Sequence, residues 1–240
     1  AMWLSKTWIL ATKLKLRSAI LFHTLKNKMA RRILIITAVK EEADAIGNPS
    51  GTFVVAGGIG RTNAAVATTA AIMADGPFEW IISAGIAGAL PNGGVQLGDI
   101  VVANKCVYAE EGLETPSGFQ NMEEMGFSLG DFKGNEVPVD DWMLKRLSNI
   151  GTVAPIATVA TCSGTNKQAE CIEARTGCVC EAMEGAAVVH AAKRVGASAI
   201  EIRAISNTTG DRDSQQWDVE LALRNLSKAV SDSIHALWSE

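Results

Sequence analysis

The sequence has few of the residues that would mark a metal or disulfide protein. It has 6 prolines and 3 histidines among 240 residues, and none of its apolar runs is both long and uncharged enough to span a bilayer. The five cysteines include no Cys-x-x-Cys pair and have no histidine at ligand spacing. We therefore expect neither metal nor cofactor, and small buried cysteines in a reducing cytoplasm.

The basic residues are unevenly distributed. Residues 1–28 hold six of the 22 Lys and Arg residues and none of the 26 acids, so the rest of the chain is strongly acidic. An acidic body repels a phosphate backbone, and we expect no nucleic-acid or membrane partner. The basic leader has features of a targeting peptide, but we favour upstream read-through with the true start at Met29. The expected domain is 29–240.

Apolar runs alternate with helical patterns after the leader. Strands are predicted at residues 33–38, 52–57, 80–83, 99–107, 153–161 and 199–206, and helices at residues 40–46, 63–74, 182–195 and 219–237. This alternation predicts a single-domain, three-layer α/β/α fold with a mostly parallel, twisted mixed sheet. Residues 108–140 break the rhythm, and a loop of that length is usually functional.

Four segments follow predicted strands, where α/β enzymes bind ligands, and a fifth opens a helix. They are residues 38–42, 57–61, 83–88, 206–213 and 181–187. Each is weak alone, because an acid in the first turn of a helix often only balances the helix dipole. Together, TAVKEEADAI (37–46), GGIGRTNAA (57–65), SAGIAGAL (83–90), EAMEGAAVVHAA (181–192) and EIRAISNTTGDRD (201–213) resemble the nucleoside phosphorylase and nucleosidase superfamily. The resemblance runs from residue 29 to the C-terminus.

The resemblance implies hydrolysis rather than phosphorolysis. Related phosphorylases hold phosphate with arginines after the first strand and in the Gly-rich turn, where this chain has residues 39–42 and 83–86. Acids there would repel a dianion. Arg61 remains a candidate anion ligand, which leaves phosphorolysis open. Glu42 aligns with the carboxylate that activates water. The alternative is that Glu41 or neither residue has this role.

The resemblance also assigns a substrate pocket. Glu184 would bind the ribose hydroxyls, or simply be a helix-start acid, and Met183 would pack against the sugar. Further pocket residues are Ile86, Ala87, Gly88 and Ser206.

Asn207 stands where adenine-specific nucleosidases have an aspartate. Its amide can donate to N7 or to a 6-oxo group but cannot protonate the base, which favours hypoxanthine unless the change is drift. Asp211 or Asp213 would supply the missing acid, although we favour their pairing with Arg212. His190 is predicted to be a packed side chain rather than a base.

Three stretches are similar to the futalosine hydrolases within this superfamily: AEEGLET (109–115), VATCSGT (159–165) and ISNTTGDRD (205–213). The similarity implies cleavage of futalosine to hypoxanthine and dehypoxanthinylfutalosine, in menaquinone biosynthesis. The alternatives are release of adenine from methylthioadenosine, S-adenosylhomocysteine or aminodeoxyfutalosine, and a nucleoside-binding sensor that lacks a water base.

Futalosine carries an aromatic carboxylate beyond its 5′ end, so that side of the pocket should hold a cation and an aromatic surface. Lys167, Trp217 and Arg212 are the candidates, with an ordinary solvated role for Lys167 as the alternative. The family implies a homo-oligomer, in which a neighbouring subunit supplies some 5′-pocket residues.

Overall fold

The structure, a computed structural model, describes residues 32–239, so the leader 1–28, Met29 and His23 lie outside the described residues. The strands are β1 (Ile33–Thr37), β2 (Thr52–Ala56), β3 (Trp80–Ala89), β4 (Ile100–Tyr108), β5 (Gly112–Thr115), β6 (Gly118–Asn121), β7 (Glu136–Pro138), β8 (Thr152–Thr158), β9 (Cys180–Ala182) and β10 (Ser198–Thr208). The helices are α2 (Lys40–Ile46), α3 (Arg61–Asp75), α4 (Asp141–Leu147), α5 (Asn166–Thr176), α6 (Gly185–Arg194) and α7 (Val219–Trp238), with a short 3₁₀ turn, η1 (Arg212–Ser214).

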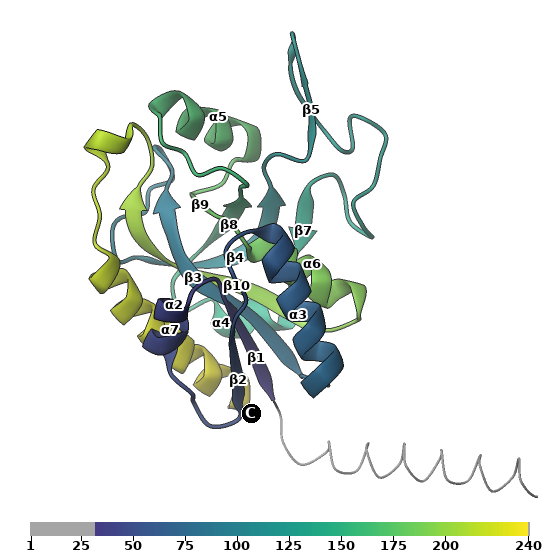
Figure 1. Cartoon of the computed structure of the whole chain (residues 1–240), viewed down its shortest axis with the longest axis vertical. Coiled ribbons are helices and arrows are strands. Elements are labelled where there is room, and N and C mark those ends of the chain that lie inside the picture. Colours follow the sequence, from purple (N-terminus) through teal and green to yellow (C-terminus); the bar gives the residue numbers. More distant parts are fainter. Residues whose placement is uncertain (1–31, 240) are drawn as a thin grey trace, which may run out of the picture.

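The large sheet is mixed and partly closed. Its strands follow the order β10-β4-β8-β9-β3-β1-β2, with β7 paired to β4. Because β10 also pairs with β3, the strands β3, β10, β4, β8 and β9 form a ring, from which β1 and β2 extend in parallel. Helices α3 and α6 pack together on one face, and α2 and α4 pack with α7 on the other (Figure 1). The predicted three-layer α/β fold is therefore confirmed.

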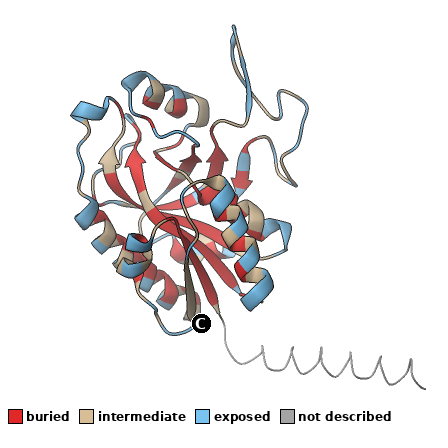
Figure 2. Ribbon diagram, viewed as in Figure 1, coloured by how far each residue is buried: buried red, intermediate tan, exposed pale blue. Residues whose placement is uncertain are grey.

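The core follows the apolar strands (Figure 2). Every residue of β1 is buried, and β3 and β10 are buried along most of their length. Burying a large aliphatic side chain stabilises the fold by about 1.5–3 kcal/mol, whereas burying an unpaired charge is costly. Glu201 and Arg203 are nevertheless buried in the middle of β10, which draws attention to that strand.

Several boundaries differ from the prediction. Residues 83–88, predicted as a turn, continue β3 up to Ala89, because β10 pairs with β3 along that length. The predicted loop 108–140 contains the β5–β6 hairpin and β7. The helix predicted at 182–195 begins at Gly185, since Ala182 still belongs to β9. The helices α4 and α5 were not predicted.

All five cysteines are free thiols. Cys106, Cys178 and Cys180 are buried, as predicted, but Cys162 and Cys171 are exposed. Across residues 32–239, no helix is long and apolar enough to cross a membrane.

Candidate active site

The carboxyl ends of β1, β2, β3 and β10 meet at one end of the sheet, and the predicted segments come together there. A carboxylate oxygen of Glu42 accepts a hydrogen bond from the Ile86 amide at 2.9 Å. Glu184 accepts one from the Gly60 amide at 3.0 Å. The hydroxyl of Ser206 donates to the Ala87 carbonyl at 3.3 Å. The Gly58 amide also donates to the Ala38 carbonyl at 2.9 Å, and these contacts together join all five segments in one site.

Glu42 lies in the first turn of α2 and is only 3% exposed. Its second oxygen accepts hydrogen bonds from the amides of Ala38 at 2.9 Å and Val39 at 3.2 Å, in the tight turn between β1 and α2. With the Ile86 amide, three backbone donors fix this carboxylate. A general base must be positioned in this way. Glu41 is exposed, so the site geometry favours Glu42.

Arg203 is at the centre of the site, although the sequence pattern did not single it out. Its Nε lies 2.8 Å from Glu201 and its Nη2 lies 3.3 Å from Glu184. A Cβ at Gly85 would lie 2.3 Å from Nη1 and 2.6 Å from Oε1 of Glu42, so the glycine allows both groups to approach β3. Burial lowers the pKa of Arg203, but the three carboxylates outweigh it and raise that pKa above its usual value, which keeps the guanidinium charged.

Glu184 stands immediately before α6 and is 5% exposed. Besides Gly60 and Arg203, it accepts a hydrogen bond from the amide of Met183 at 3.3 Å. Met183 is partly buried and packs against a small cluster at the end of the sheet. Glu184 is therefore a buried carboxylate fixed by these contacts, and not a solvated acid at the start of a helix.

Glu201 is the third carboxylate around Arg203 and is fully buried. Within residues 32–239, its Oε2 has no hydrogen-bond partner. Burial raises the pKa of Glu201, while Arg203 opposes the shift. A Cβ at Gly185 would lie 1.9 Å from this carboxylate, so α6 can begin here only with a glycine.

A cavity of about 210 Å³ lies at the carboxyl ends of β3 and β10. The residues that line it do not include Glu42, Glu184, Glu201 or Arg203. Of the predicted site residues, Gly88, Asn207, Arg212 and Trp217 line it. The Asn207 Oδ1 accepts from the Ser206 hydroxyl at 2.9 Å. The remaining lining residues were not predicted to bind substrate: Cys162, Ser163, Gly164, Glu181 and Gln215.

Arg61, the residue that left phosphorolysis open, is paired with acids. It forms an ion pair with Glu111 and lies 4.0 Å from Glu110. Burial raises the pKa of Glu111, and Arg61 opposes that shift. Glu110 and Glu111 both belong to the stretch 109–115, which is similar to the futalosine hydrolases.

The 5′-end candidates are separated in the structure. The Arg212 guanidinium lies 4.7 Å from the ring centroid of Trp217 and donates to Gln215 at 2.9 Å, so cation and aromatic surface are together at the cavity. Lys167 is exposed in the first turn of α5 and does not line the cavity.

Asp211 binds Asn166 rather than Arg212. Its carboxylate accepts from the Asn166 amide at 2.9 Å and from Nδ2 at 2.7 Å. This contact ties η1 to the start of α5, which is a structural role. Asp213 is exposed. His190 lies 3.3 Å from the Tyr108 hydroxyl with its ring edge-on to Phe132, as a packed side chain should, and burial lowers its pKa.

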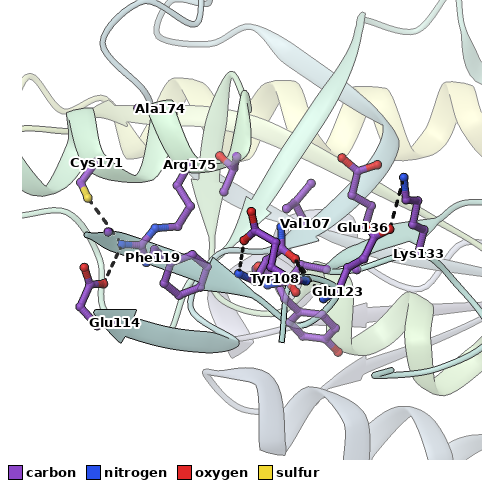
Figure 3. Close-up of a pocket in the computed structure, with 16 residues that line it drawn as sticks. Val107, Tyr108, Glu114, Phe119, Glu123, Lys133, Glu136, Cys171, Ala174 and Arg175 are labelled. Carbon is purple, nitrogen blue, oxygen red and sulfur yellow. Dashed lines mark hydrogen bonds and ion pairs between the residues drawn. The ribbon is translucent and has the colours of Figure 1, made fainter. Parts of the chain in front are cut away.

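A wider cavity of about 570 Å³ lies between α5 and the β5–β6 hairpin (Figure 3). Arg175 stacks on Phe119 at 3.9 Å and lies 3.3 Å from Glu114. Lys133 pairs with Glu123 at 3.4 Å. None of the predicted site residues lines this cavity, and both cations are balanced by acids.

The chain is similar in sequence to three futalosine hydrolases. Futalosine hydrolase of Acidothermus cellulolyticus is 35% identical over 231 residues, which cover 88% of this chain and 93% of the relative. Futalosine hydrolase of Streptomyces coelicolor is 34% identical, covering 82% of this chain and 93% of the relative. Futalosine hydrolase of Thermus thermophilus is 36% identical, covering 72% and 76%.

Solved structures share the fold. Native futalosine hydrolase of Helicobacter pylori superimposes with a TM-score of 0.71 at 17% identity, covering 87% of this chain and 99% of that one. The S-adenosylhomocysteine nucleosidase of Streptococcus pyogenes gives a TM-score of 0.71 at 20% identity, covering 88% and 99%. The model of the phosphorylase superfamily matches residues 46–239. The chain belongs to the phosphorylase superfamily.

Proposed function

We propose that this chain is a futalosine hydrolase, which uses water to cleave the N-glycosidic bond and releases hypoxanthine and dehypoxanthinylfutalosine. The names of relatives at 34–36% identity support this substrate. The observation that carries the reaction type is that carboxylates surround the end of the sheet where Glu42 lies, while Arg203 and Arg61 there are already paired with acids. Arg203 is bound by Glu201 and Glu184, and Arg61 by Glu111. A phosphate dianion would find little free positive charge.

Glu42 activates the water in this proposal. Three backbone amides hold its carboxylate, so it can accept a proton from water beside C1′. As the glycosidic bond breaks, its electron pair moves to the base and positive charge develops on the ribose. Glu184 accepts hydrogen bonds from the ribose hydroxyls, and its negative charge favours the cationic ring.

Asn207 stabilises the departing base. Its Nδ2 donates to the base at N7 or the 6-oxo group, and the oxo group carries part of the charge. The Nδ2 group donates to the Thr208 carbonyl at 3.0 Å in this structure and has a second hydrogen for the base. Trp217 and Arg212 line the same cavity as Asn207 and add an aromatic face and a cation to it.

Hypoxanthine release is the decisive assay. Purified protein is incubated with futalosine or methylthioadenosine, with and without phosphate, and the bases are separated by chromatography. We expect hypoxanthine from futalosine at a rate independent of phosphate, with free sugar as the second product. Adenine release from methylthioadenosine at equal or greater kcat/KM would refute the substrate. A phosphate requirement with a sugar phosphate product would refute hydrolysis.

A homo-oligomer is part of the proposal. Val66 and Met73 are seven residues apart, which places them on one side of α3, and they are 63% and 81% exposed; Ile59, which precedes the helix, is 55% exposed. The stripe starts beside Gly60, whose amide holds Glu184. Light scattering should give a mass above that of one chain, and Val66→Glu with Met73→Glu should lower it.

The free thiols support a cytoplasmic location.

A further inference from the structure

Glu201 is a buried carboxylate to which the proposed mechanism gives no role. It lies in β10 two residues before Arg203, so both side chains point to the same face of the strand. Glu201 is 0% exposed, and its Oε1 accepts a hydrogen bond from the Arg203 Nε at 2.8 Å. Well-packed apolar side chains often stabilise a fold as much as a buried ion pair does, so stability alone does not account for this carboxylate.

The hydrogen bond at Nε fixes the rest of the Arg203 guanidinium. The group is planar and rigid, so holding one edge sets the direction of its other two nitrogens. Nη2 lies 3.3 Å from the Oε2 of Glu184 and 3.3 Å from the Ser83 hydroxyl. Nη1 lies 3.4 Å from the Ile86 carbonyl. Among residues 32–239, the acceptor for Nε is Glu201, so its carboxylate sets the angle at which the guanidinium meets Glu184.

Glu201 also contacts the chain beside Glu184. A Cβ at Gly185 would lie 1.9 Å from the carboxyl carbon of Glu201 and 1.9 Å from its Oε2. The carboxylate is therefore packed against the backbone where α6 begins, one residue after Glu184. Because Oε2 has no hydrogen-bond partner within residues 32–239, this packing is the contact that the oxygen makes there. Glu201 thus acts on Glu184 by two routes, through the guanidinium and through the backbone.

We propose that Glu201 is a positioning residue, which orients the Glu184 carboxylate toward the ribose hydroxyls through Arg203 and the start of α6. This inference rests on the proposed function, in which Glu184 accepts hydrogen bonds from those hydroxyls. The Oε1 of Glu184 accepts from the Gly60 amide at 3.0 Å, whereas its Oε2 faces Arg203. A rotation of the guanidinium therefore turns the carboxylate about its other contact. Misplacing a binding group by about 1 Å can cost about 10²-fold in rate.

The test compares futalosine with its 2′-deoxy counterpart, which lacks one hydroxyl that Glu184 would bind. Glu201→Gln keeps the size of the side chain and an oxygen for Nε, but removes the charge that pairs with Arg203. We expect this variant to lower kcat/KM for futalosine by about tenfold, within the range for residues that act through a neighbour. With the deoxy substrate the loss should be about threefold or less, because part of the interaction that Glu201 supports is already missing.

A merely structural role would slow both substrates by the same factor, because loss of folded enzyme does not depend on the substrate. Glu136→Gln is the matched control. Glu136 lies in β7 of the same sheet and pairs with Lys105 at 2.6 Å, but its side chain is 52% exposed and lies outside the site. This variant should leave both kcat/KM values unchanged. Equal losses on the two substrates, or no loss, in a folded Glu201→Gln enzyme overturn the inference and leave the proposed function standing.

Glu201→Asp carries the test if Glu201→Gln does not fold. It keeps the charge but shortens the side chain, which withdraws the carboxylate from the Arg203 Nε and from Gly185. The same dependence on the 2′-hydroxyl should appear, with the larger loss on futalosine. Equal losses on both substrates would again rule out a positioning role for Glu201. If wild type cleaves no futalosine at all, the proposed function is what fails.

Discussion

Replacing Arg203 with Met should destabilise the protein far more than loss of an ordinary arginine. The guanidinium is 1% exposed and is the positive charge between Glu201 and Glu184, with Glu42 also near it. Removing one partner of a buried ion pair typically costs about 3–5 kcal/mol, because the remaining charge is left unpaired. For a domain of this size, that loss lowers the Tm by about 6–20 °C.

The destabilisation caused by Arg203→Met should also depend on pH. Burial raises the folded-state pKa of Glu201, and Arg203 holds the rise back, so the variant should raise that pKa further. A carboxyl group whose pKa is higher in the folded state than in the unfolded state favours folding most strongly below its unfolded-state pKa of about 4.3. This contribution to the free energy of unfolding is lost as pH rises through the folded-state pKa. The variant should therefore be closest to wild type near pH 5 and furthest from it near pH 8.

The measurement is urea unfolding followed by circular dichroism at both pH values. Arg224→Met is the control, because Arg224 is 63% exposed and pairs with an exposed Glu220, a kind of pair worth less than about 1 kcal/mol. Glu201→Gln combined with Arg203→Met should recover part of the loss. If Arg203→Met lowers the free energy of unfolding no more than Arg224→Met at either pH, the ion pairs of Arg203 do not stabilise the fold.

Three further outcomes are expected. Glu42→Gln should lower kcat by about 10²- to 10⁴-fold, since it removes the proton acceptor at constant size. It should also cost about 1–3 kcal/mol of stability, because its amide group leaves at least one of the three backbone donors unpaired. A kcat within about threefold of wild type would exclude Glu42 as the base, because general acid–base catalysis contributes at least about 10²-fold. Gly88→Ala should weaken hypoxanthine binding because its Cβ would lie 2.9 Å from the Asn207 Nδ2 and displace that amide, and unchanged calorimetric affinity would contradict this. Partial burial, and then the charges of Glu181 and Glu184, raise the pKa of the Cys162 thiol, so it should react slowly with iodoacetamide at neutral pH. Hypoxanthine should protect Cys162, which lines the cavity, but should not protect Cys171. Equal protection of the two cysteines in mass spectrometry would argue against a base site at this cavity.

Much of the fold could be read from local patterns. The helix at residues 40–46 has the predicted bounds, and β1 ends one residue early, because an apolar, β-branched run and a following acidic turn need no distant information. The extension of β3 through the Gly-rich segment could not be predicted in this way. Its glycines look like a turn locally, and they become strand because β10 pairs with them.

The site was predicted less completely, for a similar reason. Glu42 and Glu184 were identified by resemblance, and the structure brings both to Arg203. The signal for Arg203 was present, since two charges two residues apart in an apolar strand point to one face. Glu181 was taken as part of a helix start. Its place opposite Asn207 depends on the pairing of β9 with β3, which no local pattern encodes.

The charge of the cluster links stability to the reaction. With Arg203 protonated and Glu42, Glu184 and Glu201 ionised, the cluster would carry a net charge of about −2. Burial raises the pKa of Glu201, so the charge of that carboxylate is costly to hold. A phosphate dianion would increase the repulsion, whereas a ribose that becomes cationic as its bond breaks would reduce it. Water requires no positive site of its own. The same excess of carboxylates that makes the site expensive to fold therefore favours the cationic transition state and selects water as the nucleophile.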